Sequence, residues 1–314
     1  MAKLFIGGEF VDSASGEVEE IRNPATGEVV DTVAWGVVED VDRAVGAAGQ
    51  AFEGWWATPA SRRGDILYQG ARLIEENVDG LAHILTSEQG KPLREARLEL
   101  RRFIHTLEHY AGLSKNIRGG YVPNLDEGKY GLILKRPIGV CAAIVPWNFP
   151  VSLMGNKIAP ALVTGNTVVV KPAETTPLTD LKVCALLTQA GLPPGVLNVV
   201  AGRGEIVGQA LVEHPKVRKV GFTGSTAVGR QVMATAAQQI KRVTLELGGS
   251  DPMIVCDDAD IDRAVSAASV GRFFNCGQAC LAIKRLYIFE SIADEFTDKL
   301  VAKVKRLRLG DGLT

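Results

Sequence analysis

The sequence predicts an α/β fold in which a parallel sheet carries helices on both of its faces. Two observations point to this class. Apolar runs with strand character alternate with helical patterns through the middle of the chain. Glycine and proline stand beside most of these runs, where the chain must turn. Parallel strands need crossovers long enough to hold a helix, so the alternation favours a parallel sheet over a hairpin sheet.

The first part of the chain leads into this alternation. Residues 3–35 are predicted to form short strands separated by turns, and residues 39–115 show helical periodicity. Glycine and proline then mark turns within 119–137, and residues 130–136 have strand character. We expect this last segment to form a hairpin arm.

The alternation itself occupies residues 139–247. Five strands are predicted at 139–145, 167–170, 196–200, 217–222 and 242–247. Helices are predicted between them at 151–163, 179–190, 205–213 and 227–240. Open parallel sheets bind ligands at the carboxyl ends of their strands. The segments that follow these strand ends are therefore where chemistry is expected: 146–150, 171–174, 222–225 and 246–249.

The remaining residues are too few to form a good core alone. Two strands and two helices are predicted at 253–256, 261–274, 285–289 and 293–306. Such a small set of elements is marginal as an independent unit. We therefore expect this chain to be a C-terminally truncated form of a longer protein.

Composition excludes several classes of function. The chain has 314 residues, 46% of them hydrophobic and 23% charged, with a formal net charge of −1. Nothing in this balance favours nucleic acid or an anionic membrane as a partner. No run approaches the roughly 18 apolar residues of a membrane span, and the N-terminus lacks a signal-peptide pattern. The five cysteines are odd in number and irregularly spaced, which predicts reduced thiols and a cytoplasmic protein.

Three residues in segments marked by glycine or proline suggest acyl chemistry. Cys280 supplies a thiol nucleophile, Glu246 a carboxylate base and Asn148 an amide donor, the parts needed to form and hydrolyse a thioester. Glu246 stands between Leu245 and Leu247, so we expect it to be buried with a raised pKa. Each residue has a simpler interpretation: a structural thiol, a solvated carboxylate and a turn cap.

Two further segments suggest a nucleotide site. Residues from Gly224 through Ser225 to Gly229 follow a strand and open a helix, where backbone N–H groups can approach a phosphate. An ordinary strand–helix turn explains this pattern equally well. Lys171 can bond ribose hydroxyls, and Glu174 can accept from the 2′-hydroxyl while repelling a 2′-phosphate. Taken alone, this pair also fits a surface ion pair.

A metal site is the weaker alternative. His105, Glu108 and His109 fit the H-x-x-E-H pattern of a zinc hydrolase, with both histidines on one helix face. The sequence nominates no third ligand, so a solvated helix face is the preferred interpretation. Cys276 precedes Cys280 by four residues and is expected to be a small neighbour of the nucleophile. No metal is predicted.

The order and spacing of five segments resemble those of the aldehyde dehydrogenase superfamily. The segments are 146–150, 171–174, 222–225, 246–249 and 275–280. The resemblance covers essentially the whole chain. It implies a discontinuous, Rossmann-like NAD(P)-binding domain at 1–118 and 138–247. It also implies an oligomerisation arm at 119–137 and an incomplete catalytic domain at 248–314.

The same resemblance implies roles for individual residues. Cys280 would be the nucleophile, Asn148 and the Cys280 backbone N–H the oxyanion hole, and Glu246 the base that activates water. The cofactor site would contain Trp147, Lys171, Glu174, Gly224, Ser225, Gly229 and Leu247. The implied reaction is NAD(P)-dependent oxidation of an aldehyde to a carboxylic acid. Glu174 favours NAD, and NADP is possible.

Two departures from the family pattern leave alternatives open. Family members are longer and homo-oligomeric, so this chain is either an active enzyme or a truncated, catalytically impaired nucleotide-binding fragment. The second departure concerns the substrate, expected to be a small aldehyde. Residues 249–252 resemble the succinic semialdehyde branch, yet Asn156, before Lys157, replaces the arginine that usually grips the distal carboxylate there.

Overall fold

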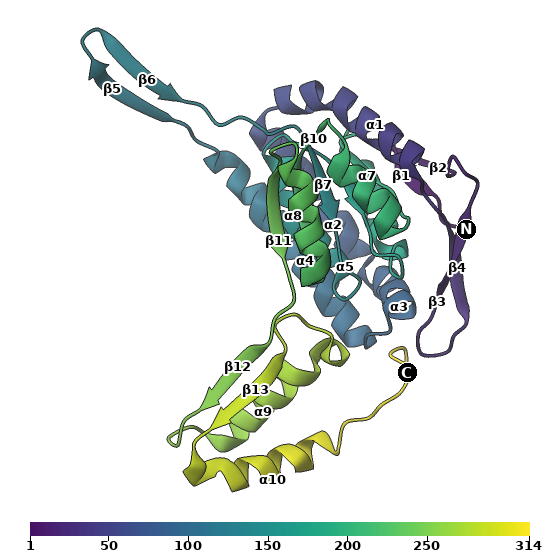
Figure 1. Cartoon of the computed structure of the whole chain (residues 1–314), viewed down its shortest axis with the longest axis vertical. Coiled ribbons are helices and arrows are strands. Elements are labelled where there is room, and N and C mark those ends of the chain that lie inside the picture. Colours follow the sequence, from purple (N-terminus) through teal and green to yellow (C-terminus); the bar gives the residue numbers. More distant parts are fainter.

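A seven-stranded sheet organises most of the chain, which the computed structural model describes over residues 1–314 (Figure 1). The strand order is β11-β10-β7-β8-β9-β1-β2. In chain order these strands are β1 (Leu4–Ile6), β2 (Glu9–Val11), β7 (Val140–Ile144), β8 (Thr167–Lys171), β9 (Leu197–Val199), β10 (Val217–Thr223) and β11 (Arg242–Glu246). The strands from β11 to β9 are mutually parallel, and β1 and β2 are antiparallel. The predicted α/β class with a parallel sheet is confirmed.

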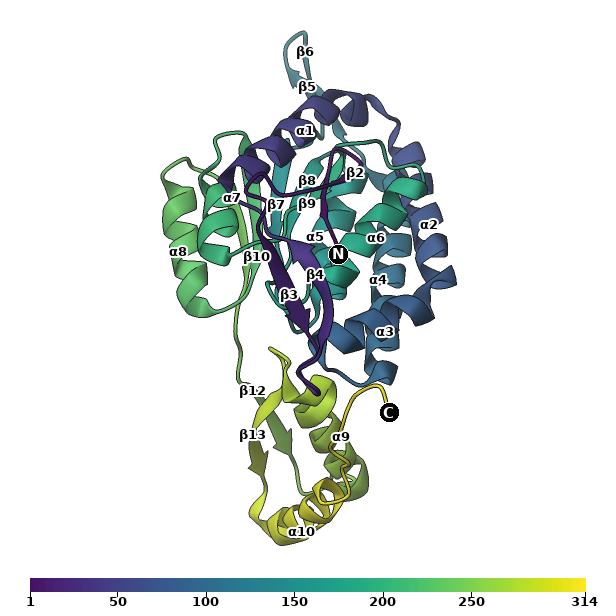
Figure 2. The ribbon, with the colours of Figure 1, turned by 90° about the vertical axis from the view of Figure 1, so that its right-hand side faces the viewer.

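Helices cover both faces of this sheet (Figure 2). They are α1 (Val38–Ala57), α2 (Ala60–Glu76), α3 (Val78–Gln89), α4 (Leu93–Leu113), α5 (Pro150–Val163), α6 (Leu178–Gln189), α7 (Gln209–Glu213) and α8 (Thr226–Ala237). On one face α5 and α6 pack on the strands, with α2, α3 and α4 outside them. The other face carries α1, α7 and α8. Right-handed crossovers require this division, because the chain adds strands first on one side of β7 and then on the other.

The core lies between these layers. A cluster of 59 buried residues includes all of β7 and the central valines of β8, which are buried on both faces as in other parallel sheets. Helix α4 comes unusually close to α5 at Gly155, where an added Cβ would lie 2.5 Å from the Phe103 ring. This close approach brings the first turns of α4 beside the start of α5.

The strand order creates a switch point between β7 and β10. From β7 the chain continues to β8 and β9 on one side and then crosses to β10 and β11 on the other. The register aligns the strand ends: Ile144 pairs with both Lys171 and Phe222, and Thr223 pairs with Glu246. A crevice at this point is the expected ligand site of an open α/β sheet.

Two hairpins lie outside the main sheet. β3 (Val18–Arg22) pairs with β4 (Val29–Ala34), and β5 (Gly120–Asp126) pairs with β6 (Lys129–Ile133). The β5–β6 hairpin projects away from the body of the molecule (Figure 1). It exposes large apolar side chains, which are Tyr121, Val122, Leu125, Tyr130, Leu132 and Ile133.

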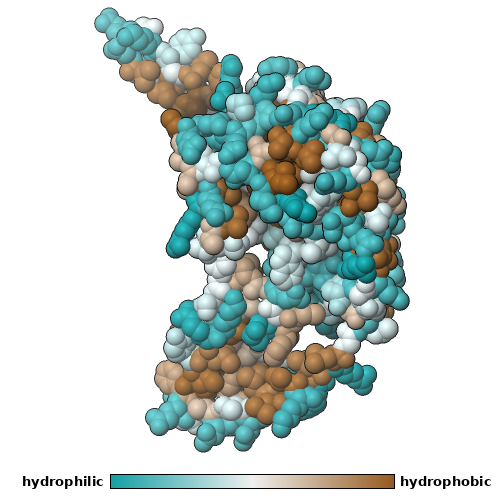
Figure 3. Space-filling model, turned by 45° about the vertical axis from the view of Figure 1, so that its right-hand side comes forward, coloured by the Kyte–Doolittle hydropathy of each residue, from teal (hydrophilic) through white to brown (hydrophobic).

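A smaller unit follows β11. It contains β12 (Asp251–Val255), α9 (Ile261–Phe273), β13 (Ile283–Ile288) and α10 (Ala293–Val304). Its own core has four buried residues: Val255, Val265, Ala268 and Phe296. Apolar side chains also gather on its surface, seen in brown in the lower part of Figure 3. Exposed members of this unit include Ile254, Val270, Leu286 and Tyr287.

Four short turns complete the chain: η1 (Ser114–Asn116), η2 (Gly204–Gly208, a π-helical turn), η3 (Phe274–Gly277) and η4 (Glu290–Ile292). Two of them, η2 and η3, contribute to the site described next. No helix has both the length and the apolar character needed to cross a membrane.

Candidate active site

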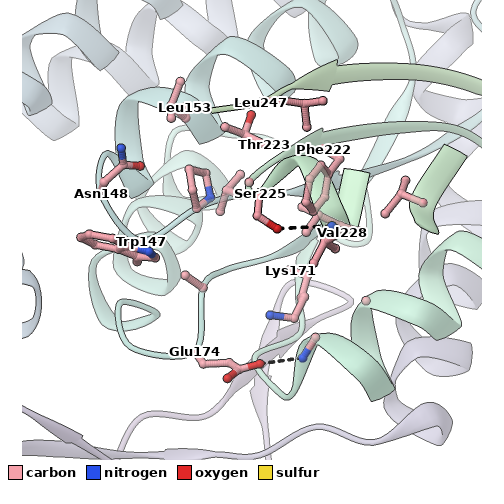
Figure 4. Close-up of a pocket in the computed structure, with 18 of the residues that line it drawn as sticks. Trp147, Asn148, Leu153, Lys171, Glu174, Phe222, Thr223, Ser225, Val228 and Leu247 are labelled. Carbon is pink, nitrogen blue, oxygen red and sulfur yellow. Dashed lines mark hydrogen bonds between the residues drawn. The ribbon is translucent and has the colours of Figure 1, made fainter. Parts of the chain in front are cut away.

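A cavity of about 920 Å³ opens at the carboxyl ends of β7, β8, β10 and β11 (Figure 4). Its walls contain most of the residues that the sequence nominated. They are Trp147, Asn148, Lys171, Glu174, Gly224, Ser225, Leu247 and Cys280. Glu246 and Gly229 are not among its lining residues. The structure therefore gathers the nominated thiol, amide and nucleotide-site residues around one space.

The end of β8 places a buried cation beside an exposed carboxylate. Lys171 is 4% exposed, and its Nζ donates to the carbonyl of Pro172 at 2.9 Å. Burial lowers the pKa of Lys171 to about 8, and the charge of Glu174 acts against this shift. Glu174 accepts the backbone N–H of Gly204 at 2.6 Å (Figure 4), which ties the turn after β8 to η2.

The first turn of α8 forms another wall. Ser225 is the N-cap, and its Oγ accepts the N–H of Val228 at 3.3 Å. A Cβ at Gly224 would lie 2.6 Å from the Phe222 ring, so no side chain fits between this turn and the strand. The start of α8 thus presents backbone N–H groups and a positive dipole end to the cavity.

Gly229 has a packing position one turn further along α8. A Cβ there would lie 2.5 Å from a terminal methyl group of Leu247. The glycine lets α8 approach the segment after β11, and Leu247 in turn lines the cavity. Gly229 therefore shapes the site through Leu247, without lining it.

Asn148 connects the turn after β7 to the loop that carries Cys280. Its side-chain Nδ2 donates to the carbonyl of Gln278 at 2.8 Å, and its Oδ1 accepts the N–H of Phe149 at 3.1 Å. An amide nitrogen carries two N–H donors, so one remains for a ligand. Two hydrogen bonds therefore orient the Asn148 amide. One of them is to Gln278, which lies two residues before Cys280.

The loop before Cys280 has a strained backbone. Asn275, Cys276 and Gly277 have φ values of 54°, 56° and 76°, all in the left-handed region. Non-glycine residues adopt this conformation only where their surroundings enforce it. Here the backbone N–H of Asn275 donates to the buried carboxylate of Glu95 at 2.6 Å. The loop leaves Cys280 exposed at the cavity, which excludes the alternative of a buried structural thiol.

Glu246 corrects an expectation. The sequence predicts a buried carboxylate, and this prediction is wrong, because Glu246 ends the edge strand β11 with its side chain exposed. Exposed and half-buried residues alternate along β11, and Glu246 belongs to the exposed set. Its charge acts on Lys157: burial lowers the pKa of Lys157 to about 8, and Glu246 opposes this shift. Lys157 Nζ donates to Thr223 Oγ1 at 2.6 Å.

The histidine pair lies elsewhere. His105 is on the exposed face of α4, and its Nδ1 lies 3.2 Å from a carboxylate oxygen of Glu108. No group of three or more His, Cys, Asp or Glu residues is placed so that it could hold a metal ion. The H-x-x-E-H pattern therefore lies on the exposed surface of α4, away from the cavity.

Sequence reasoning missed the buried polar residues beneath the site. Lys91, Glu95, Glu99 and Asn275 are each at most 8% exposed. Three of them are charged and occur near helix starts, where such residues are normally solvated. The one local signal is Gly90, the C-cap of α3, whose left-handed backbone (φ of 89°) turns the chain toward α4.

Comparison with known proteins gives a consistent result. The family model described as the aldehyde dehydrogenase family matches residues 10–314. An aldehyde dehydrogenase of Agaricus bisporus is 46% identical over 313 residues, which cover 98% of this chain and 62% of the relative. The NADP(+) succinate-semialdehyde dehydrogenase GabD of Escherichia coli K12 is 43% identical, with coverages of 99% and 64%.

The solved structures agree with this result. PnpE from Pseudomonas sp. WBC-3, in complex with nicotinamide adenine dinucleotide, has a TM-score of 0.98 and 42% identity. The match covers 100% of this chain and 64% of that one. The chain thus spans less than two thirds of the length of these relatives. Both the family model and relatives above 40% identity place it in one group: the chain belongs to the aldehyde dehydrogenase family.

Proposed function

We propose that this chain oxidises a small aldehyde to a carboxylic acid with NAD(P), through a thioester on Cys280. One observation carries the proposal. The amide of Asn148 is bonded to the loop of Cys280 at 2.8 Å, at the wall of a cavity large enough for a nucleotide. A thiol beside an oriented amide donor is the arrangement that acyl chemistry needs.

The cavity fits a dinucleotide. The N-terminus of α8, capped by Ser225, suits a pyrophosphate, and Lys171 and Glu174 suit a ribose. Trp147 and Leu247 supply apolar walls for the rest of the cofactor. Gly224 keeps the wall at α8 free of a side chain, and Gly229 acts through its contact with Leu247.

In the first half of the reaction, the Cys280 thiolate attacks the aldehyde carbon. The carbonyl oxygen becomes an oxyanion, which accepts bonds from the free N–H of Asn148 and the backbone N–H of Cys280. One such donor contributes typically about 3–4 kcal/mol. A nicotinamide cofactor held in this cavity would provide the hydride acceptor. Loss of hydride from the carbon restores the carbonyl and leaves a thioester on Cys280.

In the second half, the Glu246 carboxylate takes a proton from water, which attacks the thioester carbon. The C–S bond breaks, Cys280 leaves as a thiolate and the carboxylic acid is released. Glu246 starts from an exposed position one residue before Leu247, a lining residue, so its side chain must rotate toward the cavity. One water is consumed, and the aldehyde loses two electrons to the cofactor.

NAD is the proposed cofactor. The support is Glu174, whose carboxylate lines the cavity and would repel the 2′-phosphate of NADP. The relatives include one named for NADP(+) and one solved with NAD, so the family supports either.

The proposed substrate is an uncharged aldehyde of modest size. Asn156 is exposed on α5, one turn after the lining residue Leu153, and offers no cation for a distal carboxylate. Succinic semialdehyde is the alternative, favoured by the name of the E. coli relative.

We further propose roles for the larger parts. Residues 1–118 and 138–247 bind the cofactor, and residues 248–314 contribute the nucleophile to a catalytic domain. The exposed apolar side chains of the β5–β6 hairpin support a role for 119–137 in pairing with a second copy.

The alternative function is nucleotide binding without turnover. The small core of the unit after β11 supports it, because Cys280 belongs to a unit with only four buried core residues. In that case the chain binds NAD and forms no NADH.

Single-turnover NADH formation tests the proposal. The chain is mixed with NAD and either butanal or succinic semialdehyde, and absorbance of NADH is followed. We expect NADH and butanoate from butanal, slower reaction of succinic semialdehyde, and no NADH from Cys280→Ala. A Cys280→Ala chain that still forms NADH contradicts the mechanism. NAD binding without NADH formation by the unsubstituted chain supports the alternative.

A further inference from the structure

A buried lysine sits beneath the candidate active site, outside the cavity. Lys91 occupies the turn between α3 and α4 and is 0% exposed. Its Nζ donates to the carboxylate of Glu99 and to the backbone carbonyl of Asn148, the latter at 2.7 Å. The same ammonium lies 4.5 Å from the centroid of the Phe149 ring. The ammonium thus makes two hydrogen bonds and one contact with an aromatic ring, and Asn148 and Phe149 both belong to the turn after β7.

Glu99 extends this contact to helix α5. One of its carboxylate oxygens accepts from Lys91, and the other accepts the N–H of Ser152 at 3.1 Å. Ser152 lies in the first turn of α5, where a carboxylate also stabilises the positive end of the helix dipole. The Lys91–Glu99 pair therefore holds the turn that carries Asn148 and the start of the helix that follows it.

Glu95, one turn earlier on α4, holds the other side of the site. It accepts the backbone N–H of Asn275 at 2.6 Å. The Nδ2 of Asn275 donates to the carbonyl of Asn148 at 2.9 Å and to that of Gln278 at 3.2 Å. The turn that carries Asn148 and the loop that carries Cys280 are thus both bonded to the start of one helix, α4.

Stability alone does not explain this network. A buried ion pair gains little over a well-packed apolar group, because desolvation of both charges offsets their attraction. None of Lys91, Glu95 or Glu99 lines the cavity, so none is available to a ligand. Their bonds converge on the two loops that the proposed reaction must align, and on the carbonyl of Asn148 from two directions.

We propose that Lys91, Glu95 and Glu99 are positioning residues that set the distance and direction between the Asn148 amide and the Cys280 sulfur. The inference rests on the proposed function, because it gives Asn148 the role of oxyanion donor. A displacement of about 1 Å in such an arrangement costs on the order of a hundredfold in rate.

Two reactions of the same thiol separate positioning from general structure. Acetylation by p-nitrophenyl acetate passes through a tetrahedral oxyanion and uses the donor. Alkylation by iodoacetamide has no oxyanion and depends only on thiolate fraction and access. Both adducts are assigned to Cys280 by peptide mass mapping. The ratio of the two rate constants then reports the oxyanion donor and needs neither cofactor nor aldehyde.

The variants are chosen so that no buried charge is left alone. Lys91→Met is combined with Glu99→Gln, which keeps a carbonyl oxygen for the N–H of Ser152. Glu95→Ala removes the acceptor of Asn275, and Glu95→Gln keeps one. Asn148→Ala is the reference for loss of the donor. Arg63→Met is the matched control, because Arg63 is 3% exposed and binds the carbonyl of Val163 at 2.9 Å, at the opposite end of α5.

We expect Asn148→Ala to lower the acetylation-to-alkylation ratio by about a hundredfold. The Lys91→Met/Glu99→Gln chain and Glu95→Ala are expected to lower it about tenfold, while Glu95→Gln and Arg63→Met stay within about threefold of the original chain. A ratio that falls in Asn148→Ala but not in the two network variants overturns the positioning role alone. A ratio unaffected by Asn148→Ala overturns both this role and the proposed mechanism.

Discussion

The position of Glu246 at the end of an edge strand bears on its proposed role as a general base. The residue ends an edge strand and is exposed, so water reaches it freely. In the proposed mechanism it acts only after hydride has left, as the base for thioester hydrolysis. Glu246→Gln should therefore leave the first turnover intact and slow later turnovers by about 10²–10⁴-fold, the usual contribution of a general base.

Rapid mixing with NAD and butanal checks this expectation. The Glu246→Gln chain should give a burst of one NADH per Cys280 and an acyl adduct on Cys280 visible by intact-protein mass. Glu213→Gln is the matched control, because it makes the same Glu-to-Gln change at a surface residue, which accepts a hydrogen bond from Gln209. Equal loss of the burst and of the steady state would assign Glu246 to the first half of the reaction.

Lys171 makes stability depend on pH. Burial lowers its folded-state pKa to about 8 from 10.5, so the destabilisation from this lysine is complete below about pH 8 and disappears only above about pH 10.5. Between about pH 8 and 10.5 the unfolded chain binds more protons, and stability therefore rises with pH in this window. Each unit crossed adds up to about 1.4 kcal/mol from this residue.

Urea unfolding of the original chain and of Lys171→Met at pH 8 and 9.5 measures this effect. The advantage of Lys171→Met over the original chain should shrink by about 1–2 kcal/mol between the two pH values. Comparison within one pair removes the contributions of Lys157 and Lys241, whose pKa values burial also lowers to about 8. A constant difference between the two chains would mean that Lys171 titrates normally.

At this scale the sequence predicts the reactive groups better than their surroundings. Cys280 and Asn148 follow strand and helix ends in Gly/Pro-marked segments, and both line the cavity. The exposure of Glu246 could not be inferred, because its apolar neighbours do not reveal that β11 is an edge strand. Lys91 could not be found either, since burial of a lysine depends on partners far away in sequence.

At the scale of the elements, α8 and β11 depend on Gly229. Adding a methyl group there forces Leu247 away, because the Cβ would lie 2.5 Å from it. Gly229→Ala gains up to about 1 kcal/mol in helix propensity. It should nevertheless weaken NAD binding about tenfold, because Leu247 lines the cavity and the first turn of α8 is the one proposed to hold the pyrophosphate.

Calorimetric titration with NAD measures this loss. Gly46→Ala is the matched control, because Gly46 lies inside α1 with no atom within 4 Å of an added Cβ. It should stabilise the chain by about 0.5–1 kcal/mol and leave NAD affinity unchanged. Unchanged affinity in Gly229→Ala would show that Leu247 moves aside without disturbing the site.

Element order was predictable and element ends less so. The five parallel strands and their crossover helices occur where the alternation predicts them, because periodicity reports which residues face a core. The loop at η3 was not predictable, because its left-handed residues Asn275 and Cys276 are held by contacts with Glu95 on α4. Tertiary bonds, not local propensity, fix that backbone.

At the scale of the whole molecule, two bodies have very different cores. The sheet and its helices share 59 buried apolar residues, and the unit after β11 has four. Most residues that line the cavity belong to the larger body, although Gln278, Ala279 and Cys280 come from the smaller one. The larger body should therefore fold and bind nucleotide even where the smaller unit opens, since local stability follows buried apolar contact.

Thermal unfolding with and without nucleotides tests this division and the cofactor preference together. A ligand that binds only the folded chain raises the unfolding midpoint by mass action. Because Lys171 and Glu174, the residues proposed to hold the ribose, belong to the larger body, NAD should raise the main transition. NADP should raise it less, because Glu174 would repel a 2′-phosphate.

The variant Glu174→Gln tests the cause of this preference. It keeps an acceptor for the Gly204 N–H, bonded at 2.6 Å, and removes the charge, so it should narrow the gap between the midpoint shifts caused by NAD and NADP. A gap that persists in Glu174→Gln would place the selectivity elsewhere. A transition that ignores both nucleotides would mean that the cavity of this chain does not hold the cofactor.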